Sequence, residues 1–188
     1  MAQARFISTE YLYLHTIIDR NVDADYLTKF IDQAQDLSIQ TVLGNALFVK
    51  LKNDIASTGT TTGYYLVLLT DYIQRATAEW ALYYALPFIN YHVTNKAVST
   101  NNSDTSNASD VDSLKWLRQQ VRDNAEFYSE RIRDYLRNNS VQFPELYSTT
   151  GENIRPTNNS YYSGMYLGKS LRNNYNLRVR KSDNDCDC

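Results

Sequence analysis

The chain has 188 residues, of which 43% are hydrophobic, so it is long enough to bury the core of one domain and too apolar to be compositionally disordered. Its formal net charge of -2 argues against a protein that coats nucleic acid over its whole surface. Its 16 tyrosines, against 6 Phe and 2 Trp, favour a protein that contacts other proteins, because tyrosine is enriched at interfaces.

No targeting or membrane segment is expected. Residues 1–20 lack the basic start and the apolar block of a signal peptide. The most apolar stretch, Trp80–Ile89, is far shorter than the roughly 20 residues that a bilayer-spanning helix needs. Cys186 and Cys188 are the only cysteines, and their terminal position predicts no disulfide framework. We therefore expect a soluble, intracellular product without membrane partners.

The first half of the chain predicts three helices. Residues 8–10, Ser-Thr-Glu, can begin one or two helical turns, because Ser or Thr accepts the free amide hydrogens of a first turn. A firm helix is predicted from an Asp23 or Asp25 cap to Gly44, whose lack of a side chain suits a left-handed C-cap. A short helix, residues 45–55, follows. The apolar positions of the firm helix recur at steps of three and four: Tyr26, Phe30, Ala34, Leu37 and Thr41.

A flexible loop, residues 57–63, separates these helices from the longest apolar helix pattern. That pattern runs from about Tyr64 to Leu86, and Pro87 favours an end there, because proline lacks a backbone donor. Its stripe is broad enough to be buried against more than one neighbour. The stripe comprises Tyr65, Leu69, Tyr72, Ala76, Trp80 and Tyr83, widened by Leu66, Ile73 and Tyr84.

A segment of β-type composition, Phe88–Val93, follows Pro87, and Asn95-Lys96 can turn it back into residues 97–99. We predict a short hairpin or extended arm over about 88–105, with Phe88, Ile89, Tyr91, His92 and Val93 at a contact between subunits. Whether its edge pairs within one subunit or with the next is left open. A second long helix, residues 110–139, then buries Leu114, Leu117, Val121, Ala125, Tyr128, Ile132 and Tyr135.

The periodicity disappears from Phe143 onward. The predicted fold is therefore mainly α: a bundle of about four helices over residues 1–143, the arm between the last two long helices, and an irregular tail over 144–188. An aromatic cluster and a run of cations suggest that this tail binds a partner. The partner-binding residues proposed are Tyr161, Tyr162, Met165, Tyr166, Arg172, Arg178, Arg180 and Lys181.

No catalytic constellation can be assembled from the sequence. The only histidines, His15 and His92, stand in no metal-binding pattern. An acidic helix face lacks the Glu-x-x-His partner of a di-metal carboxylate site, and its mixed charges are typical of a solvated surface. We therefore expect no enzyme activity, no metal and no cofactor. The acidic face comprises Asp123, Glu126, Glu130 and Asp134.

Several segments together resemble a family of virion proteins, the head-tail connectors (adaptor or head-completion proteins) of crAss-like and related phages of Bacteroidetes bacteria. They are STEYL at 8–12, NVDADYLTKFIDQAQDLSIQTVLG at 21–44, LLTDYIQRATAEWALYYALPFINYHVTNKAV at 68–98, LKWLRQQVRDNAEFYSERIRDYL at 114–136 and IRPTNNSYYSGMYLG at 154–168.

The resemblance implies a helical subunit made in the bacterial cytoplasm and located in the neck of the virion. It implies a ring of roughly twelve copies, with head-to-tail contacts, below the portal protein. Further neck or tail proteins would dock beneath this ring. Genomic DNA would pass through its lumen without sequence-specific binding.

A different function for the chain is a DNA-binding or packaging accessory protein. It would act through Arg172, Arg178, Arg180 and Lys181, and its binding would fall steeply with salt.

Overall fold

The computed structural model describes residues 4–93, 98–100, 111–147 and 154–156. By its internal contacts the chain divides into two units, residues 1–158 and 159–188, and all of the described residues lie in the first. The mainly helical fold predicted from the sequence is confirmed. None of the helices in the described ranges combines the length and the apolar character that a membrane crossing requires.

Side-chain caps begin the first two helices where the sequence predicts them. Helix α1 (Thr9–His15) starts at Ser8, whose Oγ accepts a hydrogen bond of 3.1 Å from the Tyr11 amide. Helix α2 (Ala24–Ala34) starts at Asp23, whose carboxylate accepts a 3.0 Å bond from the Asp25 amide. These bonds satisfy amide hydrogens that have no partner in a first helical turn.

The predicted firm helix is continuous to Leu43 but contains a π-helical segment, η1 (Gln35–Ile39), before α3 (Gln40–Leu43). A π turn holds an extra residue, so it rotates the buried face. Leu37 and Thr41, which we predicted on the apolar stripe, are therefore exposed, and Leu37 is 54% exposed. The same rotation buries Gln35, whose side-chain oxygen accepts a 2.6 Å bond from the Phe6 amide.

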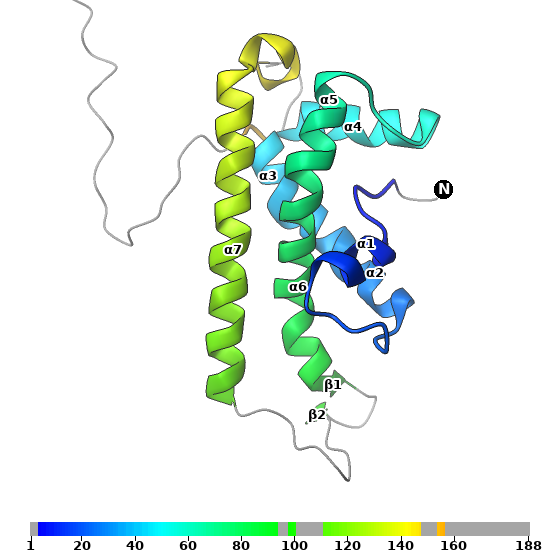
Figure 1. The fold of residues 1–188 in the computed structure, drawn as a ribbon, viewed down its shortest axis with the longest axis vertical. Helices are drawn as coiled ribbons and strands as arrows, with labels where there is room; N and C mark the ends of the chain where they lie inside the picture. The colour runs from blue at the N-terminus through cyan, green and yellow to red at the C-terminus, as the bar shows by residue number, and fades with distance from the viewer. Residues whose placement is uncertain (1–3, 94–97, 101–110, 148–153, 157–188) are drawn as a thin grey trace, which may run out of the picture. The chain divides into compact units, whose positions relative to one another are not determined.

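The remaining helices form two long antiparallel elements preceded by α4 (Asn45–Thr58). One begins with α5 (Tyr64–Val67), passes through a second π segment, η2 (Leu68–Ile73), and continues as α6 (Gln74–Asn90). The other is α7 (Val111–Asn138). Figure 1 shows α7 alongside α5 and α6, with α1 and α2 on the other side of α6.

The stripes predicted on these two long helices are largely buried. On the α5–α6 stripe, the prediction that Leu66 is buried is wrong, since 38% of its surface is exposed. The positions on both helices that are fully or partly buried are Tyr65, Leu69, Tyr72, Ile73, Ala76, Trp80, Tyr83, Tyr84, Leu114, Leu117, Val121, Ala125, Tyr128, Ile132 and Tyr135.

The predicted helix end at Pro87 is wrong, because α6 continues to Asn90. A proline removes one backbone donor, and here contacts to α2 hold the last turn. The Tyr26 hydroxyl donates a 3.0 Å bond to the Phe88 carbonyl. The Phe88 ring lies 5.4 Å from that of Phe30 between centroids. Phe88 and Ile89, which we predicted in the arm, therefore belong to the helical unit.

Two three-residue strands follow α6, β1 (Tyr91–Val93) and β2 (Val98–Thr100). They pair with one another in antiparallel register, so the hydrogen bonds of this pair lie within one chain. The facing residues are Tyr91 with Thr100, His92 with Ser99, and Val93 with Val98.

The buried side chains form two clusters along the long helices. One joins Phe6, the α3–α4 corner, η2 and the second half of α7. The other joins α1, α2, α6 and the first half of α7. Trp80 packs against both clusters, and its Nε1 donates a 2.9 Å bond to the Ser129 hydroxyl on α7. A tryptophan with its N–H satisfied therefore joins the two clusters.

Part of the predicted tail belongs to the helical unit. Phe143 is fully buried between the rings of Tyr65 and Tyr135, and two 3-10 turns flank it, η3 (Ser140–Gln142) and η4 (Pro144–Tyr147). Further along, the Ile154 carbonyl accepts a 2.9 Å bond from the Asn45 amide. The structure therefore places 144–147 and 154–156 with the bundle, not with a tail beginning at 144.

Gly44 ends α3 as predicted, but not in the left-handed helical conformation, since its φ is 77° and its ψ 160°. Pro156 lies directly against it, and a Cβ at Gly44 would meet the proline Cδ at 2.6 Å. Gly44 is therefore required both for its backbone conformation and for this close approach.

We expect Gly44→Ala to lower the free energy of unfolding by roughly 2 kcal/mol or more, because it adds a steric conflict to backbone strain. Gly59→Ala is the matched control. Gly59 has the same φ of 77° but a left-handed helical ψ of -12°, which alanine tolerates better than the ψ of 160° at Gly44, and no atom lies within 4 Å of its added Cβ, so this substitution should cost only about 1 kcal/mol. Urea unfolding measures both; equal losses would contradict a role for the Pro156 contact.

Candidate interaction surfaces

The predicted arm is described in part. Phe88 is 44% exposed although its ring contacts Phe30, and Ile89 is half-buried against the cluster of α1, α2 and α6. Residues 91–93 form β1, whose backbone pairs with β2. The exposed part of Phe88 thus lies one turn before the strand pair, at one end of α6.

The predicted partner-binding residues of the tail lie outside the described residues. They are Tyr161, Tyr162, Met165, Tyr166, Arg172, Arg178, Arg180 and Lys181.

A surface that the sequence analysis missed lies on the outer side of α7. Trp116 is 67% exposed and Phe127 is 59% exposed. They are eleven residues apart, close to three helical turns, so they share one face at a separation of roughly 16 Å. That face is opposite the buried positions of α7. The sequence contains a signal for this surface, because Trp116 and Phe127 stand at positions of the helix that are otherwise charged.

The acidic side chains on α7 are paired along the helix rather than gathered. Within the described ranges no group of three or more His, Cys, Asp or Glu residues is placed to hold a metal ion. Each predicted acid has a partner three or four residues away, as expected for a solvated helix face. The pairs are Gln119 with Asp123 at 2.8 Å, Arg122 with Glu126 at 2.7 Å, Arg133 with Glu130 at 2.9 Å and Arg137 with Asp134 at 3.1 Å.

A second exposed apolar surface comes from the start of the chain. Leu14, on α1, and Ile17, just after it, are each 67% exposed. An ion pair between Arg20 and Glu10 spans the same segment. In Figure 1, α1 and α7 lie on opposite sides of α6. The unit therefore carries two exposed apolar surfaces of different composition, which we call the α1 surface (Leu14, Ile17) and the α7 surface (Trp116, Phe127).

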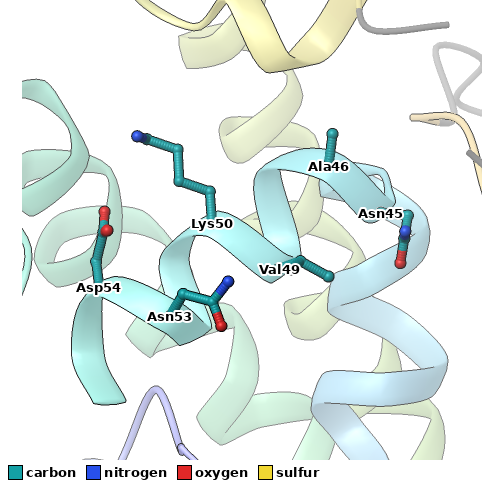
Figure 2. A pocket seen from close by; sticks show the side chains of 6 residues that line it. All are labelled: Asn45, Ala46, Val49, Lys50, Asn53 and Asp54. Carbon is teal, nitrogen blue, oxygen red and sulfur yellow. The ribbon is translucent and has the colours of Figure 1, made fainter. Parts of the chain in front are cut away.

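A shallow hollow of about 430 Å³ lies along α4 and is open to solvent. Figure 2 shows its lining, which comes from this one helix and mixes amide, charged and aliphatic side chains. Val49, the largest apolar residue there, is 44% exposed. The six lining residues are Asn45, Ala46, Val49, Lys50, Asn53 and Asp54.

Lys50 connects this hollow to a polar cluster at the end of the unit. Its Nζ lies 3.6 Å from a Glu145 carboxylate oxygen and 4.8 Å from the centroid of the Tyr65 ring. The Tyr65 hydroxyl donates to the same carboxylate at 2.9 Å. Burial, then the hydrogen bond to Glu145 and the negative charge of that carboxylate, raise the pKa of Tyr65 to about 12. This cluster does not follow from the sequence pattern, because Glu145 lies in the stretch predicted as an irregular tail.

The fold defines a mainly helical protein with two exposed apolar surfaces. Residues 39–157 match the Family of unknown function (DUF6712), and the chain belongs to that family. The match extends from η1 to just beyond Pro156, so it includes the segment that packs on Gly44. No curated protein and no solved structure matches the chain.

The pKa of Tyr65 predicts a pH dependence of stability. An unfolded tyrosine loses its proton near pH 10, whereas folded Tyr65 keeps it to about 12. The stabilisation from this group is therefore complete below about pH 10 and is lost as the pH rises to about 12. Urea unfolding at several alkaline pH values should show a shallower fall in stability for Tyr65→Phe than for the unchanged protein.

Glu145→Gln provides the second arm of that experiment. It removes the negative charge that helps to raise the pKa of Tyr65, so the loss of stability should still begin near pH 10 but should be smaller and end at a lower pH than in the unchanged protein. An unchanged pH profile in both variants would contradict the assigned environment of Tyr65.

Proposed function

We propose that the protein is a structural virion subunit that forms a ring below the portal of a tailed phage. The ring would contain roughly twelve copies joined head to tail. It joins capsid to tail, lines the DNA channel and offers its lower side to further neck or tail proteins. The sequence segments that resemble head-tail connectors support this proposal, and they include most of α2, α6 and α7.

The observation that carries the ring contact is the presence of two unlike apolar surfaces on one helical unit. A closed ring needs one patch to meet a different patch on the next copy, whereas a two-fold dimer joins a patch to itself. The α7 surface presents Trp116 and Phe127, and the α1 surface presents Leu14 and Ile17. Aromatic residues are the commonest anchors of protein interfaces, which fits the α7 surface as one half of the contact.

The strand pair after α6 is a second proposed contact. Each strand of a two-stranded sheet has one side that its partner does not cover, and such an edge can accept a strand from another chain. Phe88, which is 44% exposed, precedes the first residue of β1 by three positions in the chain. We assign Phe88, Ile89, Tyr91, His92 and Val93 to a subunit contact on this basis, and residues 161–181 to contact with the portal protein.

The ring contact can be tested by coexpression with the portal protein of the same phage and native mass measurement. We expect Trp116→Glu and Leu14→Glu each to prevent ring formation, because each places a charge in one half of the contact. For the tryptophan the loss should be about 2 kcal/mol or more per contact, as for a buried aromatic anchor. Leu37→Glu is the matched control, since Leu37 is similarly exposed but lies on neither surface.

Mixing the two variants gives a sharper result. Each variant keeps the surface that the other has lost, so a head-to-tail contact allows one joined pair and no further growth. A one-to-one pair in the mixture, with monomers of each variant alone, would support the proposal. Rings that form equally well from Trp116→Glu and Leu14→Glu would overturn this contact.

A further inference from the structure

Three segments that are distant in sequence line a second hollow, of about 550 Å³, with mostly polar side chains. Tyr11 and His15 come from α1, and their rings lie 4.1 Å apart between centroids. Arg75 comes from the first turn of α6, while Tyr128 and Arg131 come from α7. Two arginines on neighbouring helices therefore line one hollow that has an aromatic wall.

Neither arginine forms an ion pair with a carboxylate in the described part of the chain, although Asp71 and Glu79 each lie one helical turn from Arg75. Arg75 has no hydrogen bond or ion pair with another described residue, and the contact of Arg131 is with the Tyr72 ring, 5.5 Å from its centroid. Arg122, Arg133 and Arg137 on the same α7 each bind a carboxylate. Each guanidinium carries five N–H donors, so Arg75 and Arg131 retain donors for a ligand.

The acidic groups near the hollow offset only part of this positive charge. Asp71 also lines the hollow, and its carboxylate accepts a 2.9 Å bond from the Thr70 hydroxyl. Glu79 is one turn beyond Arg75; burial raises its pKa, an effect that the charge of Arg75 opposes. Burial also raises the pKa of Tyr11, which keeps its phenol protonated and able to donate.

We propose that this hollow binds a phosphate group through Arg75 and Arg131. Arginine forks match the geometry of phosphate oxygens, and charge-assisted hydrogen bonds are about twice as strong as neutral ones. Tyr11 and His15 provide a wall beside the anion, with a phenolic donor. The phosphate belongs either to a small phosphate compound or to the backbone of DNA. This site is independent of the ring contact, because it uses neither the α1 surface nor the α7 surface.

Isothermal titration calorimetry of the full chain with inorganic phosphate, at constant ionic strength in a buffer without phosphate, tests the proposal. We expect saturable binding that Arg75→Gln and Arg131→Gln each weaken by about tenfold or more. Arg131→Lys should also weaken it, because lysine keeps the charge but loses the two-pronged geometry. Circular dichroism confirms that each variant is folded before it is compared.

Arg137→Gln is the matched control, since Arg137 is an exposed arginine of the same helix that does not line the hollow. It should leave phosphate affinity unchanged. Absence of saturable phosphate binding, or an equal loss in Arg137→Gln, would overturn the proposal, and so would normal affinity in both hollow variants.

A second titration, with a short DNA duplex, separates the two sources of phosphate. Competition between duplex and inorganic phosphate, with loss of both in Arg131→Gln, assigns the site to the DNA backbone. Phosphate binding that the duplex does not displace assigns it to a small phosphate compound. Both results support the phosphate site, and neither depends on whether rings form.

Discussion

The close approach of α6 to its neighbours is the constraint on which the rest of the unit depends. Four alanines of α6, at positions 76, 78, 81 and 85, are at most 2% exposed. Small side chains let helix axes approach, and here they do so toward α2 on one side and α7 on the other. Trp80, between these alanines, fills the space between the two buried clusters. A larger residue at these alanine positions would separate the helices that carry the α1 and α7 surfaces.

Local sequence signals were sufficient to predict where the helices begin, but not to predict the π segment within one of them or the end of α6. Caps at Ser8 and Asp23 and the stop at Gly44 follow from short-range hydrogen bonding and backbone sterics, which the sequence displays directly. The π segment at 35–39 depends on burying Gln35 against the Phe6 amide, a contact 29 residues away in sequence. Pro87 inside α6 depends in the same way on Tyr26 and Phe30, so a local rule predicted the wrong end.

The surfaces differ in how much of them the sequence could predict. Trp116 and Phe127 occupy charged positions of a strongly periodic helix, so their exposure follows from the period alone. The phosphate-binding hollow draws on α1, α6 and α7, and no spacing within the sequence brings Tyr11, Arg75 and Arg131 together. Polar clusters of this kind arise from tertiary packing. The family match begins at residue 39, so it includes the segments of Arg75 and Arg131 and omits α1 with Tyr11.

The contact of residues 154–156 with the start of α4 has a mechanical consequence. The chain leaves α7 at the end of the unit where α4 lies, and there Ile154 is hydrogen-bonded to Asn45 and Pro156 packs against Gly44. A pull on any residue beyond 156 is therefore transmitted first to the α3–α4 corner, across the Asn45 amide, before it reaches α7. In a subunit whose C-terminal residues held a partner, a pulling force would act on the α3–α4 corner. It would not act directly on the exposed face of α7.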